Sequence, residues 1–407
     1  MGAVLISDAA LPAAAHLVGP DAIDVLRAPV EAAGGVLVSA RACHVQYRPG
    51  SDATVRYTAQ VAWEGAPATR ETLVAGTTAR GTHAGAAIVT ADTPAGPLEV
   101  GVWRWPFDPV LTGLRAAVTP SSAAPLVGAA DRDEVDVEVV AYRPTDRAVV
   151  RVRHGDQTTY FKVVAPHAAP ALADRHHRLR RAGVPAPRFL HLDEHGIVVL
   201  DELGGNTFRD LIKTNSGTWP GRAALDELAD AFASADLQAA PVPTAVAHAV
   251  LHASMLAAVM PRQRSRLEQL ADTLQRVEPA PRSATIHGDL HEGQLVVDNG
   301  RITGVLDIDD AGPGDPVDDR ANLIAHLRYR AVTNPELRQR LTDHADMLRR
   351  SSTGRFDGDR LDLSTAAALV GLATGPFRVQ QPGWDTSVGE LLNEAERITT
   401  LRDQSFP

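Results

Sequence analysis

The chain has 407 residues, with 40 basic and 50 acidic side chains and a formal net charge of −10. Hydrophobic residues make up 44% and charged residues 22%, which excludes a disordered chain, and the net acidity argues against a general nucleic-acid binder. No stretch reaches the roughly 18 uninterrupted apolar residues of a membrane span. The single cysteine, Cys43, cannot form an internal disulfide, and residues 1–19 lack a basic leader. We therefore expect a cytoplasmic protein of two or three domains, without nucleic-acid or membrane partners and with an oligomeric state left open.

Lysine is almost absent from this chain. Arginine supplies 38 of the 40 basic residues, and the two lysines are Lys162 and Lys213. Together with 66 alanines, this bias is typical of a GC-rich coding sequence, in which lysines drift to arginine. A lysine that remains does so by chance, or because its site needs a compact ammonium that a planar guanidinium does not replace. Lys213 lies in a polar stretch and is expected to be solvated.

The predicted elements change in character along the chain. The first 130 residues mix short β-like runs with Ala/Gly/Pro loops, and the small, polar stretch 119–130 is typical of a linker. Strands follow at 135–142, 148–153 and 158–164, then a helix at 170–182 and a buried strand at 197–203. From residue 207 the period is helical, with helices expected at 222–240, 246–259, 261–277, 317–331, 334–350, 361–374 and 386–402. This order predicts an α+β protein in which a β-rich lobe packs on a helical lobe.

One segment is repeated. Residues 47–57 (YRPGSDATVRY) align without a gap to residues 142–152 (YRPTDRAVVRV) and match at six of eleven positions. In both copies Tyr-Arg-Pro precedes an alternating strand, as a turn entering a hairpin does. Convergent turn chemistry and duplication of a lobe element both explain the match.

Residues 286–319 hold the densest chemistry. The polar loop 287–294 (HGDLHEGQ) is followed by a predicted hairpin of strands 295–298 and 301–306, joined by an Asn-Gly turn. Asp289 and Gln294 precede this hairpin and Asp307 ends it, so the three side chains can converge at one edge. Hard oxygen ligands of this kind suit Mg²⁺, which completes its shell with phosphates and water.

Three other interpretations account for less of this segment. Residues 307–318 begin like a calcium-binding EF-hand loop, but Ala311 and Asp318 fail at the fifth and twelfth positions. His287 and His291 lie four residues apart, but the residue after His287 is Gly, so the HExxH zinc pattern is absent. A solvated acidic loop explains some of the aspartates at 307–319. It explains Asp307 poorly, because this residue ends an apolar strand where a charge needs a partner.

The pattern HGDLHEGQ, a hairpin and then LDIDDAGPGDPVDD resembles the catalytic and metal-binding segments of the aminoglycoside phosphotransferase / choline kinase-like family. The resemblance extends to YFKVV around Lys162, to RRAGVPAPRFL and to VVLDELGG, and covers about residues 135–330. The HGDLHxGQ form looks most like maltokinase-type and actinobacterial sugar-kinase-like branches, which tend to carry an extra N-terminal domain. It implies a bilobal protein-kinase-like fold, with an N-terminal domain at 1–130, a kinase-like N-lobe with hinge at 131–203 and a helical C-lobe at 204–407.

The resemblance also implies roles for single residues in an enzyme that uses ATP and Mg²⁺. Asp289 is the expected catalytic residue and accepts the proton of the acceptor hydroxyl or orients this hydroxyl for in-line attack, while Asp307 and Gln294 hold Mg²⁺. The remaining implied nucleotide contacts are Lys162, Thr145 in the turn that replaces a glycine-rich loop, and Asp201 and Leu203 at the hinge. His287 is expected to support the loop.

The acceptor site is less defined. Its candidates are Asp309, His291 (a substrate contact or a loop brace), and Gln381 and Trp384 in GPFRVQQPGWD, where a Trp buried at a helix–loop junction is an equally simple reading. We expect a kinase acting on a hydroxyl of a sugar, amino sugar or aminoglycoside. The alternative is a catalytically degenerate kinase-like binding protein, because helix 170–182 lacks the family's Glu that pairs with the lysine. Asp174 is the nearest substitute.

Overall fold

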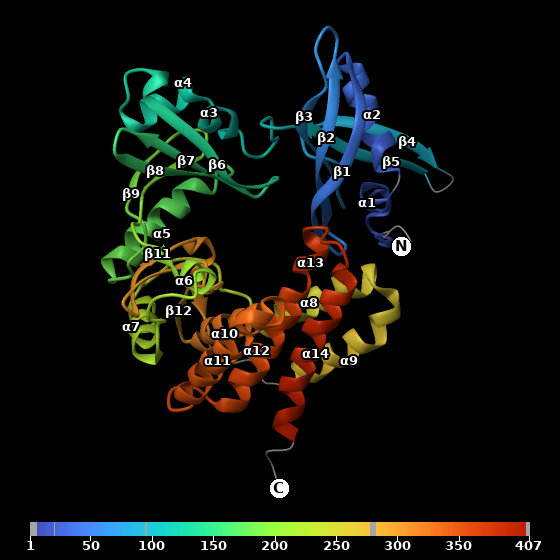
Figure 1. Cartoon of the computed structure of the whole chain (residues 1–407). Coiled ribbons are helices and arrows are strands. Elements are labelled where there is room, and N and C mark those ends of the chain that lie inside the picture. The colour runs from blue at the N-terminus through green and yellow to red at the C-terminus, as the bar shows by residue number, and fades with distance from the viewer. Residues whose placement is uncertain (1–5, 20, 94–95, 277–281, 404–407) are drawn as a thin grey trace.

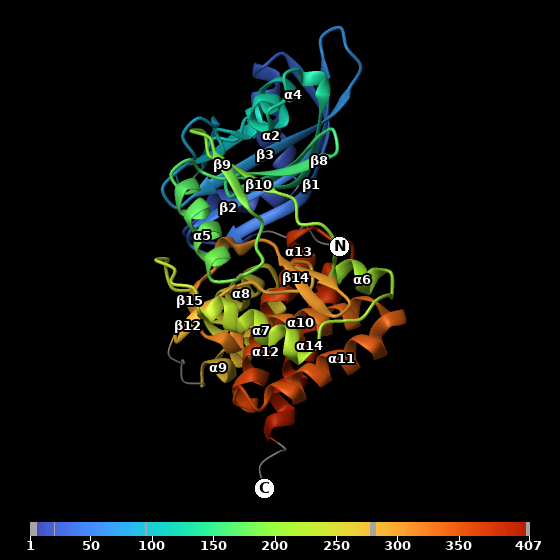
Figure 2. The ribbon, with the colours of Figure 1, turned by 90° about the vertical axis from the view of Figure 1, so that its left-hand side faces the viewer.

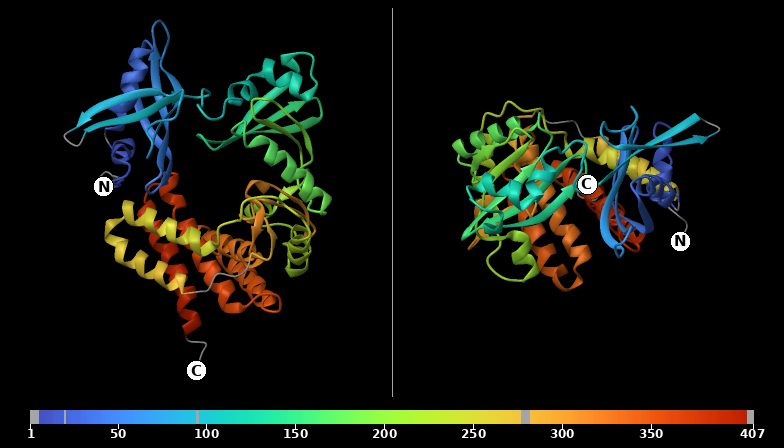
Figure 3. Two further views of the ribbon diagram at one scale, coloured as in Figure 1. Left: turned by 180° about the vertical axis from the view of Figure 1, so that it is seen from behind. Right: turned by 90° about the horizontal axis from the view of Figure 1, so that it is seen from above.

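Two antiparallel sheets stand side by side on a helical lobe in this computed structural model, which describes residues 6–19, 21–93, 96–276 and 282–403 (Figures 1 and 3). The first sheet comes from the N-terminal third of the chain and the second from the middle. The helices that follow residue 207 lie below both sheets. This arrangement confirms the expected β-rich lobe on a helical lobe.

The first sheet has five strands in the order β1-β2-β3-β5-β4. Helix α2 (Ala22–Ala32) packs on it through Leu26 and Val30, which are buried in the same core as Val45 and Tyr57 of the sheet. The preceding turns are η1 (Pro12–Ala14) and α1 (Ala15–Val18). The strands are β1 (Gly35–Arg48), β2 (Asp52–Trp63), β3 (Thr69–Thr78), β4 (Ala87–Thr93) and β5 (Gly96–Arg104).

The second sheet also has five strands, in the order β6-β7-β8-β10-β9. Helix α5 (Ala169–Arg181) connects β8 to β9 and lies between the sheet and the helical lobe (Figure 2). The strands are β6 (Val135–Arg143), β7 (Arg147–His154), β8 (Gln157–Val163), β9 (Phe189–Leu192) and β10 (Ile197–Asp201). The strands and the helix predicted from the sequence for this region are confirmed to within about two residues.

The repeated segment is the first hairpin of each sheet, in the same register. Arg48 pairs with Asp52 and Tyr47 with Ala53 in the first hairpin. The second hairpin pairs Arg143 with Arg147 and Tyr142 with Ala148, each 95 residues further along the chain. The two sheets also share one strand order, from the first strand to the third and then the fifth and fourth. Shared register and topology favour duplication over convergent turn chemistry.

The position of Lys162 is not repeated in the first sheet. Lys162 pairs with Val149 of β7. The residue 95 positions before Val149 is Thr54 of β2, and it pairs with Gly76 of β3. The first sheet therefore keeps the framework of the second but has a glycine where the second has its buried lysine.

The stretch 119–130, expected to be a linker, is largely helical. It contains α4 (Pro120–Ala123) and η2 (Ala124–Val127), which follow α3 (Leu114–Val118) and precede η3 (Arg132–Glu134). Ala123 and Ala124 are buried in the same core as Val150 and Phe161 of the second sheet. Small side chains here allow close packing on the sheet, so this composition reflects packing and not flexibility.

The helical lobe follows the sequence pattern closely. Its helices are α6 (Phe208–Lys213), α7 (Arg222–Ala233), α8 (Ala245–Val259), α9 (Arg264–Gln275), α10 (Pro316–Thr333), α11 (Arg338–Ser352), α12 (Gly358–Ala373), α13 (Gly375–Arg378) and α14 (Trp384–Asp403). Three short 3₁₀ turns accompany them, namely η4 (Pro261–Gln263), η5 (Ile308–Asp310) and η6 (Pro335–Leu337). The seven predicted helices are present, although α7 ends seven residues early, and the last residue of the predicted helix 261–277 lies outside the described residues.

Two small sheets complete this lobe and carry the loop 287–294. The predicted hairpin is confirmed as β13 (Leu295–Asp298) and β14 (Arg301–Val305), and its Asn-Gly turn has positive φ at both residues. Strand β11 (Asn206–Thr207) joins this hairpin, and β12 (Ala284–Ile286) pairs with β15 (Gly312–Gly314). Within the described ranges, none of the helices is both long and apolar enough to span a membrane.

Candidate active site

The loop 287–294 is held by an aspartate of the helix that follows it and by its own histidine. Asp319 of α10 accepts hydrogen bonds from the backbone N–H groups of His287 (2.7 Å) and Gly288 (2.9 Å). His287 is fully buried; its Nε2 donates to the Leu306 carbonyl (2.9 Å) and its Nδ1 accepts from the Asp289 N–H (3.2 Å). This geometry agrees with the expected supporting role of His287.

Gly288 is required by the shape of this loop. Its φ is +87°, and a Cβ there would lie 2.8 Å from the carbonyl oxygen of Asp310. Any other residue would be strained and would push the loop away from η5. The conformation therefore brings the segment carrying Asp289 next to the segment that follows Asp307.

One oxygen of Asp289 is bound and the other is free. Asn322 of α10 donates to Asp289 Oδ1 (3.1 Å) and also to the carbonyl of Leu290 (3.2 Å). Asp289 Oδ2 has no hydrogen-bond partner among the described residues. Asp289 is thus a fixed carboxylate with one open acceptor oxygen, which is the arrangement needed to receive a proton from a bound hydroxyl.

Asp289 lies in a cavity of about 590 Å³ between the lobes. Carboxylates, histidines and arginines line it, together with small apolar residues of α8 and α12. The charged and polar lining residues are Arg175, His248, His252, Asp289, Asp309, Asp310, Asp318, Asn322, His326 and Arg378. The cavity is large enough for a small organic molecule.

Lys162 is buried beside two carboxylates. Its Nζ lies 2.6 Å from Asp307 Oδ1 and 2.5 Å from Asp309 Oδ1, and Arg147 Nη2 lies 2.9 Å from Asp307 Oδ2. Burial opposes ionisation of Asp307, but the Lys162 and Arg147 cations outweigh it and hold the pKa of this carboxyl well below its usual range. Burial likewise disfavours the Lys162 ammonium, but Asp309 and Asp307 raise its pKa above the usual value. Lys162 and Asp307 are therefore both charged at neutral pH.

Asp307 has a strained backbone. Its φ is +54°, in the left-handed region that residues other than Gly and Asn rarely adopt. Strain of this kind persists where the surroundings hold it, and it is concentrated at functional sites. Here it turns the chain from β14 into η5 and directs the Asp307 carboxylate toward Lys162.

Asp174 does not replace the missing helix glutamate. Its carboxylate accepts from Arg178 Nε (2.6 Å) on the same helix and is half exposed. Lys162 finds its second carboxylate in Asp309 instead. Asp309 was expected to contact the acceptor; it does line the cavity, but its Oδ1 is committed to the lysine.

The expected role of Thr145 in covering phosphate does not fit its contacts. Its backbone N–H donates to Asp108 Oδ2 (2.9 Å), and its hydroxyl donates to the Pro144 carbonyl (2.7 Å). Asp108 also accepts from the hydroxyl of Tyr142 (2.8 Å), so a residue of the segment after β5 fixes the β6–β7 turn. No local pattern of residues indicates this contact, because Asp108 precedes Thr145 by 37 residues.

The residues expected at the hinge end the second sheet. Asp201 is the last residue of β10, and its carboxylate accepts from Arg188 (2.9 Å). Leu203 packs near Gly304 of β14, where a Cβ would lie 3.0 Å from Leu203 Cδ1. The chain therefore crosses from the sheet to the helical lobe at 201–203, and a nucleotide contact of these residues remains a prediction.

Gln294 fits a metal ligand in one respect. Its side-chain oxygen is buried and has no hydrogen-bond partner among the described residues. A buried oxygen without a partner costs free energy unless another group binds it. The backbone carbonyl of Gln294 accepts from the Leu306 N–H (2.8 Å), so Gln294 lies beside the residue that precedes Asp307. An orphaned amide oxygen next to an ionised carboxylate is a donor set that suits Mg²⁺.

Two residues expected at the acceptor site lie elsewhere. Trp384 is 7% exposed and packs edge-on against Phe377, with ring centroids 5.1 Å apart, in the helical core. Gln381 is exposed, and its backbone N–H caps the short helix α13 by donating to Pro376. Neither lines the cavity. Trp384 starts α14, and its apolar ring is buried where α13 and α14 meet, which agrees with the alternative that the sequence left open.

His291 is a neighbour of the cavity and not part of its lining. Its ring stacks on that of His326, with centroids 4.4 Å apart and planes 17° apart. Its Nδ1 accepts from the Gly293 N–H (3.0 Å). Burial, followed by His326, lowers the pKa of His291 to about 4, so this ring is neutral at pH 7. Of the two roles left open by the sequence, these contacts favour the brace.

Glu292 is a buried charge between cations. Arg209 Nε (3.0 Å) and Arg330 Nε (2.9 Å) contact its Oε1, and His326 Nδ1 lies 3.2 Å from its Oε2. Burial opposes its ionisation, but the contact with His326 and the charge of Arg209 hold its pKa far below the usual range. Glu292 is therefore ionised and fixes the orientation of its neighbours.

Several site residues were not found from the sequence. Arg147 is one of them and pairs with Asp307 across 160 positions. Arg378, by contrast, belongs to the segment GPFRVQQPGWD that the sequence offered for the acceptor site, and it lines the cavity from α13. Asn322, His326 and Arg330 are spaced four residues apart on α10, which places them on one face of the helix. This four-residue spacing, on a helix that begins with acidic residues, was the one sequence feature that could have indicated these three residues.

Comparison with known proteins agrees with this geometry. A family model described as the phosphotransferase enzyme family matches residues 143–352, which is more than half of the chain. The chain therefore belongs to this family, whose fold is protein-kinase-like, with an additional β-rich region before it. A search of curated proteins finds no match.

Solved structures similar to this chain come from the same group. An aminoglycoside phosphotransferase in ternary complex with ADP and hygromycin B is 18% identical, with a TM-score of 0.44, and the alignment covers 67% of this chain and 95% of that one. A type VIII aminoglycoside-3′-phosphotransferase is 20% identical (TM-score 0.41; coverage 62% and 99%). A choline/ethanolamine kinase family protein from Mesorhizobium loti is 14% identical (TM-score 0.48; coverage 70% and 93%).

Proposed function

We propose that this protein is an ATP-dependent phosphotransferase that phosphorylates a hydroxyl of a small molecule, a sugar, amino sugar or aminoglycoside. The observation that carries the proposal is the open carboxylate oxygen of Asp289 in the cavity that Asp309, the partner of Lys162, also lines. A proton acceptor and a buried cation cluster on one cavity are what in-line phosphoryl transfer needs, because its catalysis is mainly positioning and charge neutralisation.

Each residue then has a defined task. Asp289 accepts the hydrogen bond of the acceptor hydroxyl and takes its proton as the phosphoryl group is transferred. Lys162 neutralises the phosphates of ATP as a point charge, and the backbone at Asp201 and Leu203 meets the base. Asn322 and Asp319 keep Asp289 in place, because they hold its side chain and its loop respectively.

Asp307 and Gln294 would hold Mg²⁺, which supplies neutralisation of the phosphate charge when bound. The support is the ionised state of Asp307 and the orphaned oxygen of Gln294. Since both oxygens of Asp307 contact Lys162 and Arg147, these cations must share the carboxylate with the metal ion.

We further propose three functional units: an N-terminal domain at 1–130, a nucleotide-binding lobe at 131–203 and an acceptor-binding helical lobe at 204–407. The support is the division of strands and helices. The helical turns at 114–127 pack on the second sheet, so they brace the nucleotide-binding lobe although they precede it.

The test is an ATP-consumption screen with Mg²⁺ over glucose, glucosamine, maltose, aminoglycosides and choline. Asp289→Asn should lower acceptor-dependent turnover at least about a thousandfold, since it removes the proton acceptor. Asp298→Asn is the matched control, because this exposed turn residue lies outside the cavity, and should leave turnover unchanged.

Two results would refute the proposal or part of it. If no acceptor stimulates turnover, the chain is a degenerate kinase-like binding protein. Asp307→Ala should abolish Mg²⁺-dependent nucleotide binding, and if the variant keeps the wild-type dependence on Mg²⁺, Asp307 is not a metal ligand.

A further inference from the structure

Arg378 lines the cavity and has no task in the proposed reaction. It comes from the short helix α13, which packs against β1 of the first sheet (Figure 1). Its side chain is half-buried, and it makes no hydrogen bond or ion pair with any residue in the described part of the chain. A guanidinium carries five N–H donors that normally bind oxygen atoms, so this side chain is open to a ligand.

Other cations lie near Arg378 on the side of the two sheets. Burial lowers the pKa of Arg378, and the charge of Arg143 at the end of β6 lowers it further, against two aspartates that raise it. On β1, burial lowers the pKa of His44 to about 4, followed by the charges of Arg378, Arg56 and Arg143. Both sheets and α13 thus bring positive charges together. No described carboxylate forms an ion pair with Arg143 or Arg378.

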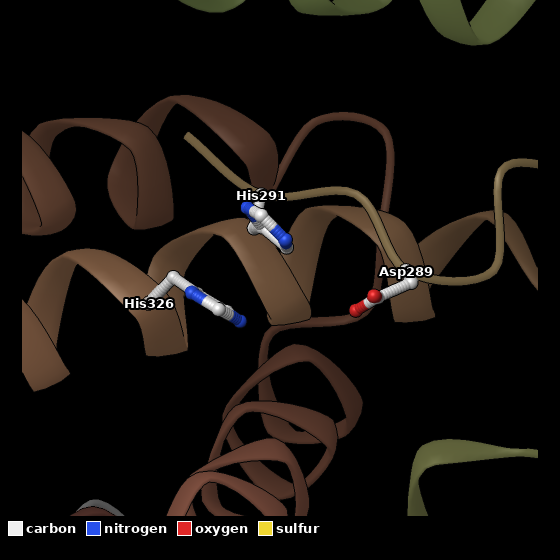
Figure 4. A group of neighbouring side chains, drawn as sticks. All are labelled: Asp289, His291 and His326. Carbon is white, nitrogen blue, oxygen red and sulfur yellow. The ribbon is translucent and has the colours of Figure 1, made fainter. Parts of the chain in front are cut away.

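Asp289 marks the catalytic part of the cavity. His326 of α10 lies beside it, and the ring of His291 stacks on that of His326 (Figure 4). Residues 309 and 310 belong to the same part, because Gly288 lets the loop lie against η5. Asp289 has its task with the hydroxyl and Asp309 is bound to Lys162, so the catalytic carboxylates do not neutralise Arg378.

The fourth carboxylate of the cavity lining is bound by neutral groups. Asp318 of α10 accepts from the Ser364 hydroxyl (3.0 Å) and from the Ala245 N–H (3.3 Å). It forms no ion pair with a described residue. The charge of Arg378 is therefore uncompensated within the cavity.

Arg378 shares the cavity with helices of the helical lobe that take no part in the chemistry. His248 and His252 of α8 line it, together with small residues of α12 such as Ala367 and Gly371. Burial, then His248 and then Arg378 lower the pKa of His252 to about 4, so α8 offers Arg378 no negative charge. At about 590 Å³ the cavity has room for a molecule that reaches both Asp289 and this part of the lining.

An unpaired guanidinium in a cavity favours an anion. Partial removal of its N–H groups from water costs free energy unless acceptor atoms replace the water, and the neighbouring Arg143 adds repulsion. A carboxylate or phosphate binds the planar fork through two parallel hydrogen bonds and also neutralises the charge. A neutral hydroxyl leaves the charge uncompensated, and an ammonium increases the repulsion.

We propose that Arg378 binds a carboxylate or phosphate carried by the acceptor, which makes the acceptor an anionic sugar and not a neutral sugar or a polycationic aminoglycoside. This inference rests on the proposed function and narrows its acceptor class. Arg378 touches the anionic group, while Arg143 and Arg56 add to the positive potential around it.

The first experiment compares matched acceptors in the ATP-consumption assay. The acceptors are glucose, glucuronate, glucose 1-phosphate and glucose 6-phosphate, so that at least one anion leaves the phosphorylated hydroxyl free. On wild type the best anionic sugar should exceed glucose by at least about tenfold in kcat/KM, the gain expected from a charge-assisted bidentate contact.

Arg378→Met keeps an unbranched apolar stem and removes the charge. It should abolish the preference for the anionic sugar, mainly by raising the KM for that sugar, and leave turnover of glucose unchanged. Arg181→Met is the control, because Arg181 is the exposed last residue of α5 and lies outside the cavity, and it should keep the wild-type preference.

The second experiment measures binding without turnover. A non-hydrolysable ATP analogue and Mg²⁺ first fill the nucleotide site. Inorganic phosphate at about 10 mM should then raise the thermal unfolding midpoint of wild type and Arg181→Met, relative to chloride at equal ionic strength, but not that of Arg378→Met. Without phosphate, Arg378→Met should be at least as stable as wild type, because it removes an unpaired charge.

The outcomes separate this inference from the proposed function. A phosphate shift that needs Arg378, in a protein that phosphorylates no acceptor, refutes the function and supports the anion site. Equal kcat/KM for glucose and its anionic forms, or a preference or phosphate shift that survives in Arg378→Met, refutes only the role of Arg378.

Three further results overturn the role of Arg378. The first is an Arg378→Met protein with a raised KM for ATP and an unchanged acceptor preference, which assigns the arginine to the nucleotide phosphates. The second is efficient phosphorylation of an aminoglycoside that Arg378→Met does not improve. The third is an Arg378→Met protein less stable than wild type without phosphate, which shows a structural role.

Discussion

Lys162 is the group whose removal should disturb the structure most at the site. Its side chain is 7% exposed and contacts Asp307 and Asp309, whose side chains are 28% and 15% exposed. Lys162→Met leaves Asp309 without a partner among the described residues, while Asp307 keeps Arg147. Removing one member of a buried ion pair destabilises by roughly 3–5 kcal/mol, and partial access to water reduces this, so we expect about 3 kcal/mol.

The loss of unfolding free energy in Lys162→Met should be larger at neutral pH than in acid. In the wild type the lowered pKa of Asp307 contributes stability that is present above its unfolded pKa of about 3.9 and is lost as pH falls. In Lys162→Met the carboxylate of Asp309 has lost its partner and that of Asp307 has lost one of two, so both bind protons more readily and protonation relieves the defect. The stability gap between wild type and variant should be full at pH 7 and shrink as pH falls from about 6 to 4.

The assay is urea unfolding of the nucleotide-free protein at pH 4.5, 5.5 and 7. The other lysine supplies the control, since Lys213 is 66% exposed and 3.7 Å from Asp210, and Lys213→Met should stay within about 0.5 kcal/mol of wild type. Adding Asp309→Asn to Lys162→Met should recover part of the loss. A Lys162→Met protein as stable as wild type at pH 7, or a gap that does not change with pH, would refute the reasoning.

Four further predictions follow from single contacts. Lys162→Arg should lower kcat by about tenfold or more despite keeping the charge, because a planar guanidinium does not fit between two carboxylates, and near-normal kcat would make the survival of this lysine accidental. Asp319→Ala strands two loop N–H groups and should lower stability by about 2–4 kcal/mol in thermal unfolding; an unchanged midpoint would contradict its bracing role. Trp384→Ala should destabilise by about 3–5 kcal/mol with no change in acceptor KM, and a raised KM would return this residue to the acceptor site. Asp108→Ala should raise KM for ATP by loosening the β6–β7 turn, and an unchanged KM would leave the Asp108 contact purely structural.

The arrangement of the first sheet suggests how the N-terminal region relates to the site. It repeats the strand order and the first hairpin register of the second sheet, yet has Gly76 where the second has Lys162. Asp108, which follows its last strand, holds the turn of the second sheet. We infer that the first sheet contributes support to the nucleotide-binding lobe and not a second nucleotide site.

The sequence alone determined those features that depend on neighbours in the chain. Alternating and helical periods predicted the second sheet and seven helices, because each element buries one face along its own length. The Asn299-Gly300 turn fixed the hairpin between Gln294 and Asp307 through backbone preferences. The place of Asp289 in the loop 287–294 predicted that it lies close to this hairpin, and its catalytic role was inferred from the resemblance of HGDLHEGQ to the family's catalytic segment.

Only the tertiary structure decided which distant side chains meet. Arg147 reaches Asp307, Asp309 takes the place of a helix glutamate at Lys162, and His326 arrives beside Asp289 from α10. The sequence left Trp384 open between an acceptor contact and a buried residue at a helix–loop junction, and the packing of α13 against α14 places it in the core. Contacts of this kind are set by the packing of whole elements against one another, and no local pattern of residues encodes them.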